Sequence, residues 1–346
     1  MKILVTFLLL YCYSLEASNK FGIWENLEVN HHVLYVLEKY ESENMTQHKF
    51  LSWHGGVIYP SYPPAFFVFS WASWRIFGRP EKYIFLKCLS FYLLLISSLF
   101  LYKIFRYFKI EPITAFLSCL VYIFMPTNLH FGISCYWAHH LWMPLFLASI
   151  LSYFQGKKGL FLFLSFLQCY IIWEGYVVSY VFSLIFFLKR DYKNSLSIIF
   201  LAGLAFLINA LHFSLEISMD SYFMTLVARQ AYRSGSESGW LDCLRKIILL
   251  ENSIFLVVSL FCLIFVFKII DYKKFLNCLL LFIPCFASFV IAQHDFTYGF
   301  GRMKFLPGLI LIFAFIIEQI PIKARIPIIL SLVVLNYFIY LELYDR

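Results

Sequence analysis

The chain has 346 residues, of which 62% are hydrophobic, 21% aromatic and 14% charged. Ordinary soluble domains carry about 25% charged residues, so this composition excludes a typical soluble fold and predicts a single all-α integral membrane domain over residues 1–346. The net charge of +8 would suit a nucleic-acid partner. The basic residues, however, form short clusters between apolar segments and no continuous patch, so we expect no binding to nucleic acid.

About eleven apolar segments follow one another along the chain, and each is a candidate transmembrane helix. A helix needs about 20 apolar residues to cross the hydrocarbon core. Several segments are shorter, so pairs such as 158–173 and 176–188 also fit re-entrant helices. The first segment follows Lys2 and fits an uncleaved helix, which we favour, or a cleaved signal peptide; both export the residues that come next. The segments span roughly residues 3–17, 83–105, 112–126, 138–154, 158–173, 176–188, 195–213, 252–269, 275–292, 305–320 and 326–341.

Lysine and arginine gather in every second linker between these segments. Short cytoplasmic linkers of polytopic proteins keep an excess of Lys and Arg, so the pattern predicts a cytoplasmic N-terminus and an extracytoplasmic C-terminus. It also predicts three outer loops, at residues 18–82, 214–251 and 293–304. Only four of the 20 acidic residues share the basic linkers, namely Glu111, Asp191, Asp271 and Glu318. The basic linker residues are Lys103, Arg106, Lys109, Lys157, Lys158, Lys189, Arg190, Lys193, Lys268, Lys273, Lys274, Lys323 and Arg325.

The large first outer loop holds a polar part followed by an aromatic part. Glu25, Glu28, His31 and His32 lie near its start. Its later part contains Tyr62-Pro63-Pro64 and an apolar, Trp-rich stretch over residues 63–78 that ends in Phe77-Gly78. The stretch is too short to span comfortably, so we expect an amphipathic helix lying at the outer membrane interface.

This succession of a first helix, an outer loop with an early acid, and an aromatic-Pro-Pro turn into an amphipathic helix resembles the C-type glycosyltransferase superfamily. The closest branch uses polyprenyl-phosphate sugars and includes the protein O-mannosyltransferase-like and lipid A aminoarabinose transferase-like enzymes. The resemblance is best over residues 1–110. Over the whole chain it is limited to the topology, that is, the succession of membrane spans and loops. It implies an inverting hexosyl or pentosyl transferase that moves a sugar from a polyprenyl-phosphate donor to a glycan, lipid or protein acceptor.

The resemblance also implies a catalytic carboxylate early in the first outer loop, where it acts as base or orients the acceptor. The family usually has Asp there, whereas this chain has Glu28 and, less well placed, Glu25. A glutamate can likewise take the proton of an acceptor hydroxyl. His31 and His32 follow Glu28 by three and four positions, so on a helix at least one shares its face and helps to orient it. Tyr62, in the aromatic-Pro-Pro turn, is a further candidate substrate-binding residue.

The family's second acid, between the third and fourth helices, has no counterpart here. His139 and His140 occupy that region instead. They offer hydrogen bonds or metal ligands, or they simply cap a span at the interface. Adjacent residues of a helix point about 100° apart, so the two are not expected to bind one metal ion together. Glu174 stands between two apolar runs, and an ionisable group at membrane depth indicates a functional role.

The last outer loop is dense in polar residues and supplies the remaining candidates. A departing polyprenyl phosphate needs cations or backbone N–H groups, and Arg302 is the first candidate for this role. Lys304 is the second candidate, and its alternative role is that of an interfacial anchor. Arg229 of the second outer loop is a third candidate for binding the departing phosphate. His294 and Asp295 are candidates for orienting a hydroxyl group.

Two other functions use the same outer face: a transporter or flippase for lipid-linked glycan, and an O-antigen-polymerase-like enzyme. A transporter needs a polar path through the bilayer, but the apolar segments contain few charges, and Lys87 and Glu318 lie near segment ends. This scarcity favours an enzyme. The sequence identifies no cofactor beyond a divalent metal ion as a candidate, and it leaves the sugar, the acceptor and the polyprenyl length open. We expect the protein in a bacterial inner membrane, in contact with membrane lipid.

Overall fold

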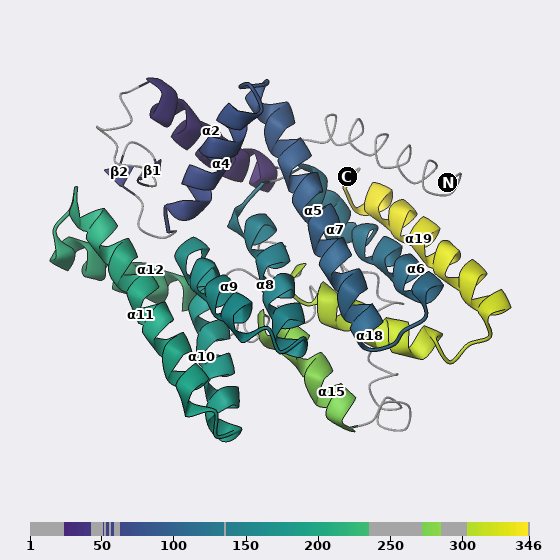
Figure 1. The fold of residues 1–346 in the computed structure, drawn as a ribbon. Helices are drawn as coiled ribbons and strands as arrows, with labels where there is room; N and C mark the ends of the chain where they lie inside the picture. Colours follow the sequence, from purple (N-terminus) through teal and green to yellow (C-terminus); the bar gives the residue numbers. More distant parts are fainter. Residues whose placement is uncertain are drawn as a thin grey trace.

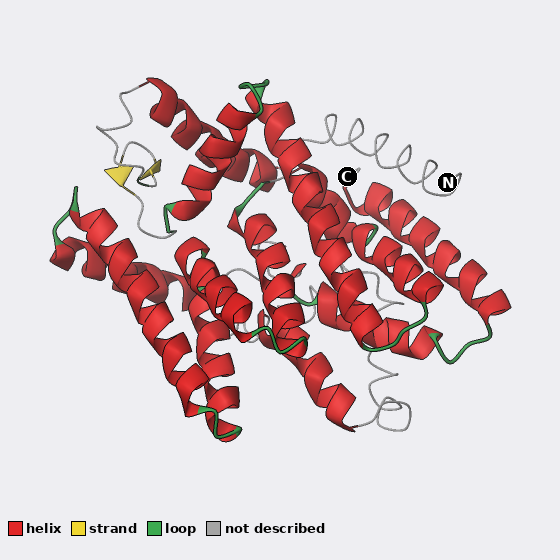
Figure 2. Cartoon of the chain, in the orientation of Figure 1, coloured by secondary structure: helices red, strands yellow, loops and turns green. Residues whose placement is uncertain are grey.

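The computed structural model describes residues 24–42, 51, 53–54, 57–58, 63–134, 136–234, 272–284 and 303–344. These residues are almost entirely helical, which confirms the all-α prediction (Figures 1 and 2). Two short antiparallel strands, β1 (Trp53–His54) and β2 (Val57–Ile58), pair with each other. In chain order the helices are α2 (Trp24–Ser42), α4 (Ala65–Ile76), α5 (Lys82–Tyr107), α6 (Pro112–Ile123), α7 (Pro126–Ser134), α8 (Ala138–Phe154), α9 (Lys158–Ile171), α10 (Glu174–Leu188), α11 (Tyr192–Ser214), α12 (Met219–Ser234), α15 (Tyr272–Leu279), the 3-10 helix η1 (Leu280–Phe282), α18 (Leu306–Ile317) and α19 (Ile322–Tyr344).

Three of the described helices are long and apolar enough to cross a membrane: α5, α11 and the part Ile322–Leu341 of α19. Four shorter apolar helices, α6, α9, α10 and α18, have 12 to 15 residues. At about 1.5 Å per residue they are roughly 20 Å long, less than the hydrocarbon core of about 30 Å. The membrane character is therefore supported by three helices, and the number of eleven spans stays a prediction. The expected spans 3–17 and 252–269 lie outside the described residues, as does the end of 275–292.

The surface of α11 shows why a lipid environment suits this fold. Ile198, Ala202 and Ala205 are buried on one face of the helix. On the opposite face, large apolar side chains are exposed at helical spacing: Leu196, Phe200, Leu207 and Leu211. Soluble monomers seldom expose a continuous apolar stripe of this kind. Because water would make such a stripe unfavourable, the exposed face of α11 is best matched by hydrocarbon.

Four of the basic linkers meet at one end of the helices, which we call the basic end. It consists of the α5–α6, α8–α9, α10–α11 and α18–α19 linkers (residues 108–111, 155–157, 189–191 and 318–321). Tyr107 stacks on Phe154 with ring centroids 5.1 Å apart, and Phe108 contacts Phe315 at 5.6 Å. Lys158 Nζ lies 2.7 Å from Asp191 Oδ2. The alternation of charge along the chain thus corresponds to a grouping of linkers in space.

Helices α2 and α4 lie at the other end of the helices, beside the start of α5 (Figure 1). Glu41 of α2 is 3.5 Å from Arg75 Nε and 3.4 Å from Arg79 Nη2. Lys82, the first residue of α5, is 3.2 Å from Glu38. The expected amphipathic helix over 63–78 is α4, which buries one face and leaves Ile76 81% exposed. Its position at a membrane interface stays a prediction.

Segments expected as loops contain three further helices. Within 18–82, α2 forms because Val33, Val36, Leu37 and Tyr40 recur at helical spacing and are all buried. Within 214–251, α12 begins after Ser218, whose Oγ accepts a hydrogen bond from Ser221 N at 3.1 Å, a typical N-cap. The linker before α8 holds α7. Short helices with mixed polarity escape a search for long apolar runs. Of the third expected outer loop, 293–304, only its last two residues are described.

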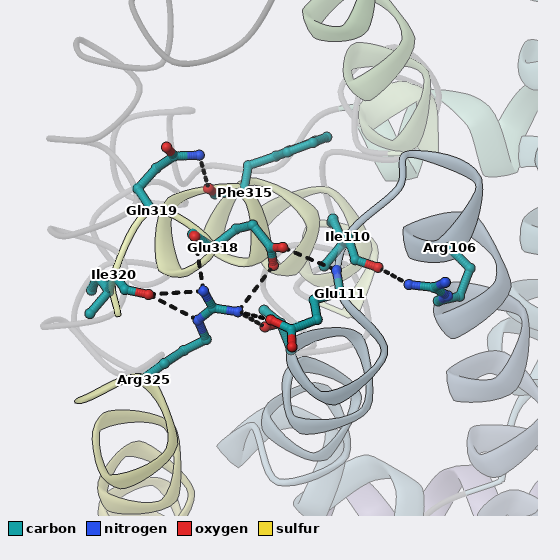
Figure 3. Close-up of polar contacts among 9 residues, drawn as sticks. Arg106, Ile110, Glu111, Phe315, Glu318, Gln319, Ile320 and Arg325 are labelled. Atoms are coloured by element: carbon teal, nitrogen blue, oxygen red, sulfur yellow. Dashed lines mark hydrogen bonds and ion pairs between the residues drawn. The ribbon is translucent and has the colours of Figure 1, made fainter. Parts of the chain in front are cut away.

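Arg325 joins two of the basic linkers through a dense set of contacts (Figure 3). Its Nη1 donates to Glu111 Oε2 at 2.6 Å and to Thr114 Oγ1 at 2.6 Å. Its Nη2 and Nε reach the carbonyl oxygens of Glu318 and Ile320 at 2.9 to 3.1 Å. Glu318 Oε1 in turn accepts from the backbone N–H of Glu111 at 3.1 Å. The guanidinium therefore ties the start of α6 to both ends of the α18–α19 linker.

Replacement of Arg325 by Met should destabilise the fold strongly. It leaves two carboxylates without their cation and two carbonyls without their donor. We expect a loss of about 2 kcal/mol in the free energy of unfolding in detergent, because the hydrogen bonds of a buried guanidinium are lost while Glu111 and Glu318 are partly exposed to solvent. Lys323→Met is the matched control, because Lys323 is exposed in the same segment, and it should change stability by less than about 0.5 kcal/mol. Equal effects of the two substitutions would contradict the assigned role of Arg325.

The orientation of the basic end can be tested by cysteine labelling of intact cells. In a variant lacking the nine native cysteines, Lys82→Cys should react with a membrane-impermeant thiol reagent. Lys158→Cys should react only after permeabilisation. Both side chains reach solvent, with 27% and 58% exposed, so burial cannot explain a difference. Labelling of position 158 from outside would overturn a cytoplasmic basic end.

Candidate functional site

Three residues from distant parts of the chain converge in one buried cluster: His139, Glu174 and Lys304. Glu174 Oε1 lies 2.7 Å from Lys304 Nζ and 3.1 Å from His139 Nε2. The exposed fractions of the three residues are 1% for His139, 4% for Glu174 and 0% for Lys304. His139 lies in the first turn of α8, Glu174 begins α10, and Lys304 precedes α18 by two residues. The group lies at the helix ends opposite the basic end. We call it the outer cluster, after the outer face that the charge pattern of the sequence predicts for those ends.

The electrostatics of the outer cluster depend on close contact between opposite charges. Removing a Lys and a Glu from water costs several kcal/mol for each ion, and only a short, direct pairing offsets that cost. Glu174 lies at the N-terminus of α10, where the positive end of the helix dipole stabilises its carboxylate. Lys304 lies just before the N-terminus of α18, where the dipole is also positive and therefore destabilises its ammonium group. Lys304 therefore depends on its partners, the carboxylate and the ring of Trp142, whose centroid is 5.9 Å from Nζ.

The turn between α9 and α10 positions Glu174 by bringing the two helices very close. A Cβ atom on Gly175 would lie 2.4 Å from the backbone of Gln168, so only glycine fits there without a shift. Gln168 also receives a hydrogen bond at 3.0 Å from Trp142 Nε1 to its Oε1. The same turn thus holds both the carboxylate and the indole that surround Lys304.

The two adjacent histidines of α8 point to different partners. His139 faces Glu174, whereas His140 Nδ1 accepts a hydrogen bond from the backbone N–H of Trp137 at 3.1 Å. The two rings therefore lie in different surroundings. Among the described residues, no group of three or more His, Cys, Asp or Glu side chains is arranged to hold a metal. A divalent metal as cofactor stays a prediction.

An aromatic contact connects α2 to the start of α8. The ring of His32 stacks on Phe67 of α4 at 5.5 Å and meets Trp137 edge-on at 5.3 Å. Trp137 is two residues before His139, at the start of α8. Glu28 lies one helical turn before His32 in α2, and His31 is exposed. The helix that carries the expected base is therefore packed against the segment that carries the outer cluster.

The remaining sequence candidates are not brought into a described contact. Glu25 and Glu28 belong to α2 and Arg229 belongs to α12, but only their place in the helix is described. Tyr62, His294, Asp295 and Arg302 lie outside the described residues. Their roles stay predictions.

Two residues of the site escaped the sequence analysis, namely Trp142 and Gln168. Gln168 interrupts the apolar run 158–173, and that interruption is the signal that would have indicated it. A tryptophan in an apolar helix carries no such signal, because most tryptophans there simply fill the core. Lys304 proves to be fully buried, which excludes the alternative of an interfacial anchor reaching toward water.

Comparison of the chain with known protein families found no match, and neither did searches of curated proteins and of solved structures.

A double-mutant cycle should show that Glu174 and Lys304 stabilise each other. Glu174→Gln and Lys304→Met should each lower the free energy of unfolding by about 3 kcal/mol, since each leaves a buried charge without its partner. The double variant should be more stable than the sum of the two losses predicts, by about 2 kcal/mol. Lys193→Met, at an exposed position of α11, serves as the control for loss of a positive charge. Additive losses would show that the pair is not coupled.

Proposed function

We propose that this protein is an inverting membrane glycosyltransferase that moves a sugar from a polyprenyl-phosphate donor to an acceptor at the outer face of the membrane. One observation supports this most: His139, Glu174 and Lys304, each selected by its chemistry, meet in one buried cluster beside the helix that carries Glu28. A polar site at one end of apolar helices suits a lipid-linked donor. The lipid reaches it laterally while the reacting sugar stays at the interface.

In this proposal Glu28 acts on the acceptor. Its carboxylate takes the proton of an acceptor hydroxyl as the oxygen forms a bond to the anomeric carbon of the sugar. The bond from that carbon to the phosphate oxygen breaks, and its electron pair leaves with the polyprenyl phosphate. A single displacement of this kind inverts the configuration at the anomeric carbon. His32, packed between α4 and α8, keeps the helix of Glu28 in place.

The departing phosphate is assigned to Arg302 in this proposal. Lys304 is already paired with Glu174 at 2.7 Å, so it is a positioning residue that anchors the chain two residues after Arg302. Arg229, His294, Asp295, His140 and Tyr62 remain candidates for binding the donor or the acceptor. The proposal includes the eleven-span topology, a cytoplasmic basic end and a place in a bacterial inner membrane.

A transporter for lipid-linked glycan is the second candidate, because a buried titratable pair such as Glu174 and Lys304 is also common on ion and substrate paths. The two functions differ in their product. The enzyme forms a new glycosidic bond, whereas a transporter moves the lipid-linked glycan across a vesicle membrane unchanged.

Glu28→Gln should abolish transfer, since it keeps the shape of the side chain and removes the base. The assay measures radiolabelled sugar passed from a panel of polyprenyl-phosphate sugars to membrane acceptors, with membranes containing or lacking the protein. We expect a loss of about 10²–10⁴-fold relative to wild type, the range typical of general-base catalysis. Expression and donor binding should stay unchanged.

Glu25→Gln is the matched control, because it lies one turn earlier in the same helix. It should keep wild-type turnover. Loss in Glu25→Gln alone would move the catalytic role to that residue, and full activity of both variants would remove the enzymatic role of this helix.

A further inference from the structure

A cavity of about 360 Å³ lies at the basic end, away from the outer cluster. It is formed where the ends of α5, α8 and α10 come together with the second half of α15. Its lining residues are Tyr107, Tyr153, Phe154, Phe186, Lys189, Asp191 and Asn277. Tyr107 is 45% exposed and Lys189 is also exposed, so the cavity opens to the surface. The proposed glycosyl transfer uses none of these residues.

One wall of the cavity is aromatic. Tyr107 and Phe154 stack nearly parallel, with centroids 5.1 Å apart and an angle of 7° between the rings. Tyr153 meets Phe186 edge-on at 5.7 Å. Rings held against one another in this way present a rigid apolar surface, which suits the glycerol and upper acyl carbons of a lipid better than a purely polar ion.

Lys189 supplies the positive charge inside the cavity. Its Nζ donates to Tyr153 Oη at 2.6 Å and lies 5.1 Å from the centre of that ring. Among the described residues, no carboxylate forms an ion pair with Lys189. The ammonium group has three donors, so an anion in the cavity can bind it without breaking the bond to Tyr153.

The Asp191 carboxylate in the same cavity is already engaged by other groups. Lys158 Nζ and Asn194 Nδ2 each lie 2.7 Å from its Oδ2. The hydrogen bond from Lys158, followed by that from Asn194, holds the pKa of the Asp191 carboxyl below its usual range. Asp191 therefore stays ionised but paired with Lys158, and its repulsion of a second anion is reduced.

The surroundings of the cavity are strongly basic. Among the described residues up to five positions from the linkers of the basic end, three acids stand against ten Lys and Arg residues, and all three acids already have Lys158 or Arg325 as a partner. Anionic lipid headgroups are attracted to such clusters by about 1 kcal/mol per basic residue near the surface. The acids are Glu111, Asp191 and Glu318, and the basic residues are Lys103, Arg106, Lys109, Lys157, Lys158, Lys189, Arg190, Lys193, Lys323 and Arg325.

We infer that this cavity binds the phosphate headgroup of an anionic phospholipid from the leaflet at the basic end. Lys189 binds the phosphate, and the amide of Asn277 supplies a further hydrogen bond. Tyr107 and Phe154 pack against the glycerol and the first acyl carbons. The volume of about 360 Å³ lies within the range of pockets that hold small ligands. The site is independent of the proposed glycosyl transfer and of which leaflet the basic end faces.

The test measures the thermal unfolding midpoint of the full-length protein in a neutral detergent during titration with short-chain phosphatidylglycerol. Binding to the folded state should raise the midpoint in a saturable way. Phosphatidylcholine with the same chains should have a smaller effect, and inorganic phosphate at the same concentration almost none. In Lys189→Gln, the phosphatidylglycerol concentration that gives half of the maximal rise in the unfolding midpoint should increase about five-fold, as expected for the loss of one basic contact.

Two control variants separate the cavity from general surface charge. Lys323→Gln loses the same charge at the basic end but outside the cavity lining, and it should respond like wild type. Tyr153→Phe removes only the hydroxyl that Lys189 contacts, and it should also keep the response. An equal loss in Lys189→Gln and Lys323→Gln would reduce the effect to diffuse charge and overturn the site. An equal response to both lipids, or a full response to inorganic phosphate, would likewise overturn it.

Discussion

Helix α18 is attached at both ends to distant parts of the chain by polar contacts of charged side chains, and the described structure depends on that double attachment. Before its first turn, Lys304 pairs with Glu174, 130 residues away. After its last turn, Glu318 contacts the backbone of Glu111 and the guanidinium of Arg325. Within the helix itself, Leu306–Ile317, every residue except Ile316 is buried. When an apolar helix packs among apolar neighbours, sliding it along its axis changes the free energy of burial only a little. The polar contacts at its two ends therefore determine its position.

Close packing of α18 against η1 further restricts movement of the helix along its axis. A Cβ atom on Gly308 would lie 2.5 Å from the ring of Phe282 in η1. A slide of α18 by one turn, about 5.4 Å, would bring a larger side chain against that ring and would separate Lys304 from Glu174. The two ends of the fold are therefore coupled through one short helix, although their chemistry differs. One end holds a buried carboxylate with two basic partners, and the other holds a large excess of Lys and Arg.

Much of the helix pattern could be predicted from the sequence, because long apolar runs bounded by charged residues are a strong local signal. The runs 83–105, 138–154 and 195–213 correspond closely to α5, α8 and α11. Helix α2 was harder to predict, since its apolar residues recur at helical spacing among many polar ones and look like part of a loop. The alternation of charge along the sequence also predicted that the basic linkers lie on one side. It did not predict the hydrogen bonds and ion pairs between them, such as that of Arg325 with Glu111.

The candidate site shows the same limit. Glu174 and Lys304 could be selected one at a time, because an ionisable residue beside an apolar run is unusual wherever it occurs. Their contact could not be predicted, since it depends on the packing of α10 against the start of α18. The burial of Lys304 was also unexpected, because a lysine at the end of an apolar segment more commonly extends toward water. A single sequence contains the residue types of a site, but the pairing between distant residues depends on tertiary packing.

The pairing of Lys304 with Glu174 also affects whether Lys304 can bind a second anion. A phosphate that bound Lys304 directly would lie close to Glu174, and its repulsion from that carboxylate would offset much of the attraction to the ammonium. A cation that already has a carboxylate partner at 2.7 Å is thus a poor choice for holding a second, exchangeable anion. The same pairing is well suited to fixing the backbone just before α18. Because Glu174 begins α10 and His139 lies in the first turn of α8, the pair holds the start of α18 against both helices. The contribution of Lys304 that follows from this geometry is therefore to the stability of the fold.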